Sequence, residues 1–202
     1  MKKNILIFTS LAAVALMLYT GCCPKLPCPC LPMCETFDAQ ALNQQYGKVG
    51  GVVANPPGSV IFSATGNVPV HIQNIDLSPS GMFFEFARVE AAPASFGSGQ
   101  VVNTNNVCLE FDFAGKNVKE VSIEFLDLGG SENIFVNGAQ VLVGEITTFG
   151  TATVGGVQVS VGGLATVPGG KKGKITAKRV TSDIKSFRVG GQEFYLDNLC
   201  YQ

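Results

Sequence analysis

Apolar and polar residues alternate in short runs along most of the chain after residue 34. In 109–113, Leu, Phe and Phe alternate with two acids, and 121–125 repeats the pattern with Val, Ile and Phe. A period of two places the apolar side chains on one face of a strand, so both segments are predicted to be half-buried β-strands. The same reasoning predicts further strands at 34–39, 59–64, 67–76, 82–90, 133–137, 139–143, 157–162, 173–180, 184–189 and 193–200.

Turn-forming residues separate these segments. Asn137-Gly138 is a two-residue hairpin signal, and Gly-Gly pairs punctuate much of the remaining chain. No window after residue 34 keeps a helical period, and one short helical turn is expected at 39–45. Short strands at these intervals predict an all-β domain at 35–202, organised as a two-sheet antiparallel β-sandwich that is jelly-roll-like.

The segment 1–21 has the three parts of a secretory signal peptide. Two lysines precede a mostly apolar stretch at 5–18, and small residues stand before Cys22. A membrane-spanning helix needs about 20 apolar residues, so this stretch is expected to be removed after export. Export implies an oxidising compartment, in which cysteines form disulfides.

The residues Leu18-Tyr19-Thr20-Gly21-Cys22 resemble the lipobox of bacterial lipoproteins. In that family the cysteine receives a diacylglycerol, with further acyl chains such as palmitate, and becomes the mature N-terminus. The resemblance implies a protein anchored at Cys22 in the cell envelope, because several acyl chains give stable membrane attachment. The family usually has Leu where this chain has Tyr19. Cys23 rather than Asp follows the anchor, which favours the outer membrane if the host is Gram-negative.

A spacer at 22–34 follows the predicted cleavage site and is rich in cysteine and proline. Proline favours an extended chain, so the spacer is expected to hold the domain away from the membrane. The thiols of Cys28, Cys30 and Cys34 could bind a soft metal, but their spacing matches no common zinc pattern. Disulfides are the favoured interpretation.

Seven cysteines minus the lipidated one leave six, which allows 15 pairings. The simplest pairing joins spacer cysteines to each other and Cys108 to Cys200 within the domain. An alternative joins Cys34 to Cys200 and clamps the first strand to the last.

Charge and composition exclude several functions. The net charge is −1 and becomes −3 once the two signal-peptide lysines are removed, so no nucleic acid is expected as a partner. His71 is the only histidine, it lies between two apolar residues, and a strand position explains it better than catalysis. No nucleophile elbow, P-loop or zinc-protease motif occurs. An enzyme is not expected, and a carboxylate-based hydrolase is the weak alternative.

Three segments resemble exported bacterial jelly-roll domains that are similar to galactose-binding-like and carbohydrate-binding modules; these are Phe37-Asp38, 105–113 and 187–198. The resemblance spans most of 35–202 and implies that Asp197, in the closing strand, ligates calcium. Asp38 is a plausible partner if the first and last strands are neighbours, and Glu193 is a weaker third. The alternative is that Asp38 and Asp197 make local hydrogen bonds at turns and strand ends.

Two further features bear on ligand binding. The chain has no Trp. If Phe84 and Phe86 face the core, Phe83 points outward, so Phe83 and Tyr195 are the candidate ligand contacts. Packing under a loop would also explain an outward Phe83. Lysines at 171–178 could touch anionic polymers or could protect an edge strand from aggregation.

These observations predict a membrane-anchored, non-catalytic binding module for glycan or another envelope polymer, with optional structural calcium. The alternative is a structural envelope lipoprotein that contacts other proteins. An exposed aromatic or amide-lined groove would favour the first, and a flat apolar patch of several hundred Å² would favour the second.

Overall fold

A computed structural model describes residues 31–202 of the chain. The predicted signal peptide, the predicted lipidation site Cys22 and the spacer cysteines Cys23, Cys28 and Cys30 lie outside these residues. Pro32–Gln202 forms one compact unit. Within the described residues, no helix is both long enough and apolar enough to cross a membrane.

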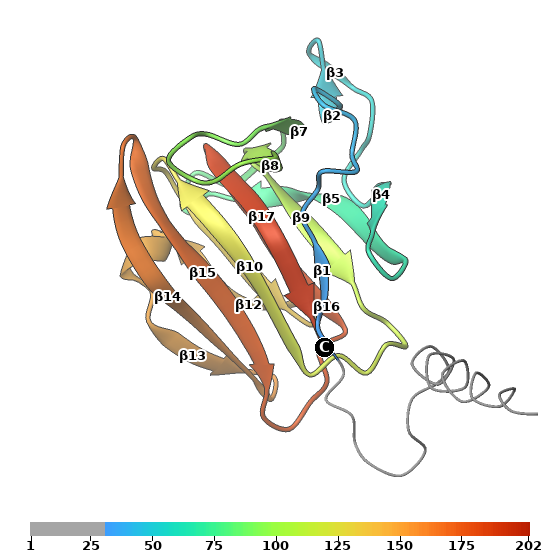
Figure 1. Ribbon diagram of the computed structural model, residues 1–202, viewed down its shortest axis with the longest axis vertical. Helices are drawn as coiled ribbons and strands as arrows, with labels where there is room; N and C mark the ends of the chain where they lie inside the picture. Colours follow the sequence, from blue (N-terminus) through green and yellow to red (C-terminus); the bar gives the residue numbers. More distant parts are fainter. Residues whose placement is uncertain (1–30) are drawn as a thin grey trace, which may run out of the picture. The chain divides into compact units, whose positions relative to one another are not determined.

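The larger of two antiparallel sheets contains ten strands (Figure 1). Its order is β13-β14-β15-β10-β17-β8-β7-β2-β3, and β1 also pairs with β17. The strands are β1 (Met33–Glu35), β2 (Gln45–Val49), β3 (Val52–Val53), β7 (Phe86–Ala91), β8 (Gln100–Asn105), β10 (Glu120–Asp127), β13 (Thr151–Val154), β14 (Val157–Val167), β15 (Gly170–Arg179) and β17 (Phe194–Tyr201).

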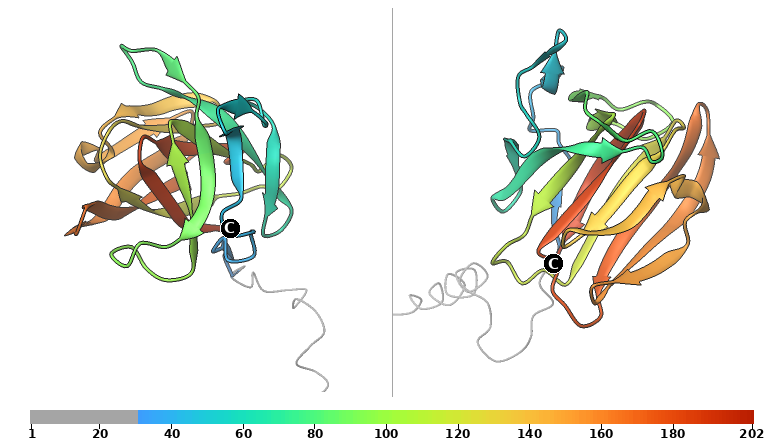
Figure 2. Two further views of the ribbon diagram at one scale, coloured as in Figure 1. Left: turned by 90° about the horizontal axis from the view of Figure 1, so that it is seen from above. Right: turned by 180° about the vertical axis from the view of Figure 1, so that it is seen from behind.

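The smaller sheet contains seven strands in the order β12-β11-β16-β9-β5-β4, with β6 paired to β5. They are β4 (Val60–Ala64), β5 (Val68–Asp76), β6 (Met82–Phe83), β9 (Val107–Asp112), β11 (Glu132–Val136), β12 (Ala139–Gly144) and β16 (Ser186–Gly191). One 3-10 turn, η1 (Ile146–Thr148), follows β12. The two sheets pack against each other (Figure 2), so the predicted β-sandwich is confirmed.

The core lies between the sheets and is built by the alternation seen in the sequence. Leu109 and Phe111 of β9 face Ile123 and Phe125 of β10 across one continuous cluster of buried side chains. The ring of Phe125 stacks on that of Phe194, with centroids 5.3 Å apart. Each fully buried large apolar side chain contributes about 2–3 kcal/mol relative to exposure, so this cluster is the main source of stability.

The segment 82–90, predicted as one strand, is two strands in different sheets. β6 belongs to the smaller sheet and β7 to the larger, and the chain crosses between them at 84–85. The crossing shifts the alternation, because Ala87 and Val89 are buried in the core. The condition that Phe84 and Phe86 both face the core therefore holds only for Phe84, which packs against the core. The ring of Phe86 lies 5.6 Å from the guanidinium of Arg88, on the outer face.

Several elements were missed. Strands β2, β3, β8 and β13 were not predicted. In β8, for example, the alternation is broken because Val101 and Val102 are both fully buried, and β13 has only four residues. Residues 39–44 form turns instead of the expected helical turn, and β2 begins at Gln45. The hairpin signal Asn137-Gly138 is confirmed, since both residues have positive φ and join β11 to β12.

The disulfide predicted between Cys108 and Cys200 is wrong. Cys200 is bonded to Cys34, which lies directly opposite it on β1 with a Cα–Cα distance of 4.1 Å. Cys108 is buried and free. It alternates with the core residues Leu109 and Val107 of β9 and faces away from the core, as Cys200 does on the other sheet. Two cysteines on the outer faces of opposite sheets cannot meet, because the sheets themselves are about 10 Å apart.

Candidate functional site

Four connections that cross from one sheet to the other gather at one end of the sandwich. They are residues 84–85, 106, 128–131 and 192–193. Backbone hydrogen bonds join them in sequence: Glu85 N donates to Asn106 O, Asn106 N to Gly191 O, and Gln192 N to Ser131 O. The crossovers therefore form one hydrogen-bonded rim rather than four separate loops.

This rim and the turn after β5 enclose two adjoining hollows of about 450 Å³ and 390 Å³. Both hollows are lined by Asn106 and Gln192, so they form one site, which we name the amide groove. Its other lining residues are Leu77, Ser78, Pro79, Ser80, Phe83, Asn105, Leu128, Gly129, Gly130, Ser131 and Glu193. Volumes of this size are typical of small-ligand sites.

Asn106 is the single residue between β8 and β9 and has a left-handed backbone, with φ of 53°. Asn tolerates this conformation better than most residues. Its side-chain amide donates to Asn105 Oδ1 over 3.0 Å. Its own Oδ1 is buried and, among the described residues, has no hydrogen-bond partner. A buried acceptor without a donor costs free energy, so this oxygen is an unsatisfied group in the wall of the groove.

Gln192 forms the centre of the groove and is fixed by the loop opposite. Its Oε1 accepts a hydrogen bond from Ser131 N over 3.1 Å. The glycines at 129 and 130 allow this approach: Gly130 has a φ of 110°, and a Cβ there would lie 2.7 Å from Cβ of Gln192. The loop 128–131 is thus shaped to bring the amide of Gln192 into the groove.

The lining of the groove combines amides and hydroxyls with exposed apolar surface. Phe83, predicted as a ligand contact, lies on β6, is 42% exposed and lines the groove. Glu193 is the only charged lining residue. Amides both donate and accept hydrogen bonds, and an aromatic face packs against apolar C–H surface. The arrangement suits a neutral ligand that carries several hydroxyl groups.

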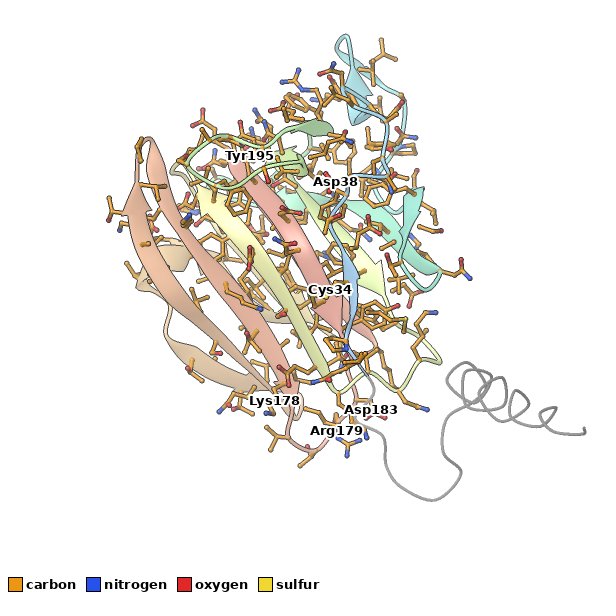
Figure 3. The ribbon with its side chains drawn as sticks, in the orientation of Figure 1. Cys34, Asp38, Lys178, Arg179, Asp183 and Tyr195 are labelled. Carbon is orange, nitrogen blue, oxygen red and sulfur yellow. A yellow bond between two sulfur atoms is a disulfide. The ribbon has the colours of Figure 1, made fainter. Side chains whose placement is uncertain are left out.

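Tyr195, the other predicted contact, is not among the lining residues. It lies on the outer face of the larger sheet (Figure 3), beside Glu90 and Arg88. Burial first, and then the neighbouring Glu90 carboxylate, raise the pKa of its phenol. A ligand contact at Tyr195 stays a prediction from the sequence.

The structure brings together only part of the predicted calcium set. Glu193 precedes β17 and Asp197 lies four residues further along it, a separation of about 13 Å at 3.3 Å per residue. This separation does not favour one cation bound by both side chains, and calcium at Asp197 with Asp38 stays a prediction. Asp38 instead ties a turn to β8: its Oδ1 accepts from Gln100 N over 2.7 Å and its Oδ2 from Thr36 Oγ1 over 3.1 Å.

Asp197 is buried and lies near other acids. Burial is the first cause that raises its pKa, to about 6; the backbone N–H of Asn198 opposes this, and the carboxylates of Asp38, Glu124 and Glu35 add to it. Asn198 donates to Asp197 Oδ1 over 2.7 Å. These contacts are the local hydrogen bonds that were the alternative to calcium ligation.

The lysine-rich segment is not at an edge. β15 lies between β14 and β10, so the prediction of an edge strand is wrong. Two of its charges form ion pairs: Arg179 bonds Asp183 at 2.7 Å, and Lys178 lies 3.8 Å from Glu120. Figure 3 shows Lys178, Arg179 and Asp183 together at one end of the domain.

The sequence did not identify a cluster of three carboxylates, which we name the carboxylate triad. Asp127, Glu132 and Glu145 each offer an oxygen within 4.8 Å of the others. Burial raises the pKa of Glu132 to about 8, against a hydrogen bond from Ile146 N. Burial also raises the pKa of Asp127, whereas the Thr147 hydroxyl lowers that of Glu145. The sequence signal that could have identified Asp127 and Glu132 is an acidic residue in phase with the buried apolar residues of its strand.

Comparisons of the chain with family models, with curated proteins and with solved structures gave no match. The β-sandwich is therefore established by the strand pairing itself, and the resemblance to lipoproteins and to carbohydrate-binding modules stays a prediction from the sequence.

Proposed function

We propose that this protein is a lipid-anchored, non-catalytic module of the bacterial cell envelope that binds a neutral glycan or similar envelope polymer in the amide groove. The groove's composition is the observation that carries the proposal. Asn106 and Gln192 supply donors and acceptors at the centre, with hydroxyls of Ser78, Ser80 and Ser131 around them. Sugar hydroxyls are both donors and acceptors and match such a lining.

The position of the groove supports this function. The described chain enters at β1, where Met33 pairs with Tyr201 at the end of β17. Gln192 and Glu193 precede the start of β17, about 23 Å away along that strand. A chain tethered through Cys22 would thus present the groove on the side away from its attachment.

The Cys34–Cys200 disulfide agrees with export, because such bonds persist in oxidising compartments. It also joins the first described strand, twelve residues after Cys22, to the last strand of the domain. Force applied through the lipid anchor would be carried directly into the centre of the larger sheet. In a Gram-negative host, Cys23 after the anchor favours the outer membrane.

The test is equilibrium binding of the purified protein to a panel of neutral polysaccharides and cell-wall preparations. We expect saturable binding to at least one neutral glycan. Phe83→Ala should weaken it about tenfold, which corresponds to roughly 1.4 kcal/mol, because the exposed ring loses its contact with the sugar. Tyr195→Phe is the matched control and should bind as the unaltered protein does.

Binding that is equally strong in Phe83→Ala would place the ligand elsewhere and contradict the proposal. Failure of every neutral glycan to bind would also contradict it.

A second candidate, a protein-contacting role, is favoured by one observation. The hairpin of β2 and β3 projects from the domain (Figure 1) and exposes Val49, Val52 and Val53. Three valines fall short of the several hundred Å² that mark protein interfaces, so the amide groove is preferred. Capture of an envelope protein that is lost in Val52→Ser, with no glycan binding, would favour this second role.

A further inference from the structure

We propose that the carboxylate triad of Asp127, Glu132 and Glu145 is a calcium site. The inference stands independently of which ligand occupies the amide groove. It also assigns the cation to residues other than Asp38, Asp197 and Glu193.

Two of the three carboxylates occupy inward positions where a charge needs a partner. In β10, Val121, Ile123 and Phe125 belong to the core, and Asp127 continues their side of the strand. In β11, Ile134 belongs to the core and Glu132 precedes it on the same side. Asp127 and Glu132 therefore lie on the core-facing sides of their strands, one in each sheet, at the end of the sandwich. An unpaired buried carboxylate is costly, so this arrangement calls for a counter-charge.

Glu132 is the residue that points to a ligand. Its side chain is fully buried, and one carboxylate oxygen, Oε2, accepts a hydrogen bond from Ile146 N over 2.9 Å. The other oxygen, Oε1, has no hydrogen-bond partner among the described residues. A cation bound between the three side chains would satisfy this oxygen.

Spacing and ligand chemistry favour calcium. Calcium–oxygen distances are about 2.3–2.6 Å, so two ligands on opposite sides of the ion lie about 5 Å apart. The triad oxygens lie within 4.8 Å of one another. The cluster contains neither histidine nor cysteine, which selects hard cations. Magnesium prefers to keep several waters, and a fully buried Glu132 leaves little room for them.

The charge balance agrees with a divalent ion. Lys171 lies near both Asp127 and Glu145, and its ammonium donates to Thr147 Oγ1 over 3.1 Å. Calcium binding would displace the proton that the raised pKa of about 8 keeps on Glu132. In the bound state, three ionised carboxylates and one lysine would leave two negative charges, which one calcium ion would neutralise.

Calcium on the triad would also fix the loop beside it. Asp127 and Glu132 bracket residues 128–131, and Gly129 N donates to Asp127 Oδ1 over 2.7 Å. The same loop lines the amide groove. An ion that joins its two ends would hold the loop in one conformation, whatever the groove binds.

The test titrates chelator-treated protein with calcium chloride by calorimetry and follows the melting temperature in 10 mM calcium and in EDTA. We expect one calcium ion per chain with a dissociation constant of about 0.1–1 mM, as in other extracellular modules, and a rise in melting temperature of about 5 °C. Glu132→Gln keeps the shape of the side chain and should weaken binding about tenfold or more. Glu145→Gln, at an exposed position, keeps an oxygen that can accept the hydrogen bond from Thr147 N and should weaken binding several-fold.

Asp197→Asn is the matched control, because Asp197 is also a buried acid of the larger sheet but lies outside the triad. It should bind calcium as the unaltered protein does. The proposal is overturned if calcium neither binds nor changes the melting temperature, if Asp197→Asn loses binding while Glu132→Gln keeps it, or if magnesium stabilises the protein as strongly as calcium does.

Discussion

Two buried glutamates at opposite ends of the sandwich have opposite surroundings. Glu35, near the entry of the chain, accepts hydrogen bonds through Oε1 from Phe37 N and through Oε2 from the backbone and hydroxyl of Thr65. Glu132, near the amide groove, is more deeply buried and has one oxygen without a partner. The first carboxylate holds two segments of the fold together. The second costs stability unless something binds it.

The difference extends beyond these two residues. At the entry end, the Cys34–Cys200 disulfide and the hydrogen bond from Tyr201 to Thr65 O, at 2.7 Å, close the structure. At the groove end, Asn106 Oδ1 is a second buried acceptor without a donor. At the entry end, the carboxylate of Glu35 has hydrogen-bond partners within the fold, whereas at the groove end Glu132 Oε1 and Asn106 Oδ1 have none. This contrast agrees with the proposal that the protein is attached at one end and binds its ligand at the other.

The largest effect is expected when the predicted lipid anchor at Cys22 is removed. Cys22→Ser cannot be acylated, so the protein should move completely from the membrane fraction to the soluble fraction, because no acyl chain remains to bind the bilayer. Fractionation of cells and the mass of the mature N-terminus provide the measurement. If the unaltered protein is found in the membrane fraction but its N-terminus has no added acyl mass, the predicted lipid anchor is refuted.

The disulfide is expected to be the largest single contribution to stability at that end. It closes a loop with a sequence separation of 166, and the chain-entropy model gives about 5 kcal/mol for loops of this size. The double variant Cys34→Ser and Cys200→Ser should lose about that much free energy of unfolding in chemical denaturation. Cys108→Ala is the control and should cost about 1 kcal/mol. A loss in this control as large as in the double variant would contradict the observed disulfide pairing.

At the groove end, Gly130→Ala should be costly. Its φ of 110° is unfavourable for alanine, and the added Cβ would lie 2.7 Å from Cβ of Gln192. We expect a loss of about 2–3 kcal/mol in the free energy of unfolding. Gly150→Ala, where the added Cβ meets nothing within 4 Å, should change stability by less than about 0.5 kcal/mol. Similar values for the two variants would show that the loop 128–131 is not held against Gln192.

Asp197, between the two ends, gives the smallest effect and one that depends on pH. Its pKa is raised from 3.8 to about 6 in the folded protein, so the folded state holds the proton more tightly than the unfolded state. Stability should therefore decrease as pH rises from about 4 to about 6. Asp197→Asn should remove this decrease, and the difference between the two proteins should change by about 1–2 kcal/mol over that range.

Denaturation of both proteins at several pH values measures the difference and cancels the contribution of titrating groups that lie far from Asp197. A constant difference across the range would contradict the raised pKa.

The sequence predicted the fold class because the core strands alternate strictly, as in β9 and β10. It could not predict where the chain changes sheets. At 84–85 the crossing reversed the expected orientation of Phe86, and no local signal marks such a point. The disulfide was mispredicted for a related reason, since the choice between Cys34 and Cys108 depends on strand pairing across the whole domain.

The candidate sites divide in the same way. Phe83 was identified from its position in an aromatic run, and it lines the groove. Asn106 and Gln192 were not, because single residues at crossovers have no pattern around them. Asp127 and Glu132 did carry a signal, as acids in phase with apolar residues of their strands, and a search for such acids would have found two members of the triad.

The amide groove as the ligand site is the central claim, and it is tested most directly by titrating isotope-labelled protein with a neutral glycan while recording backbone amide NMR shifts. The account predicts that the largest shifts belong to Phe83, Asn106, Ser131 and Gln192, with little change around Tyr195 and Arg88 on the outer face. Shifts concentrated on the outer face or on the hairpin of β2 and β3, with the groove unaffected, would contradict it.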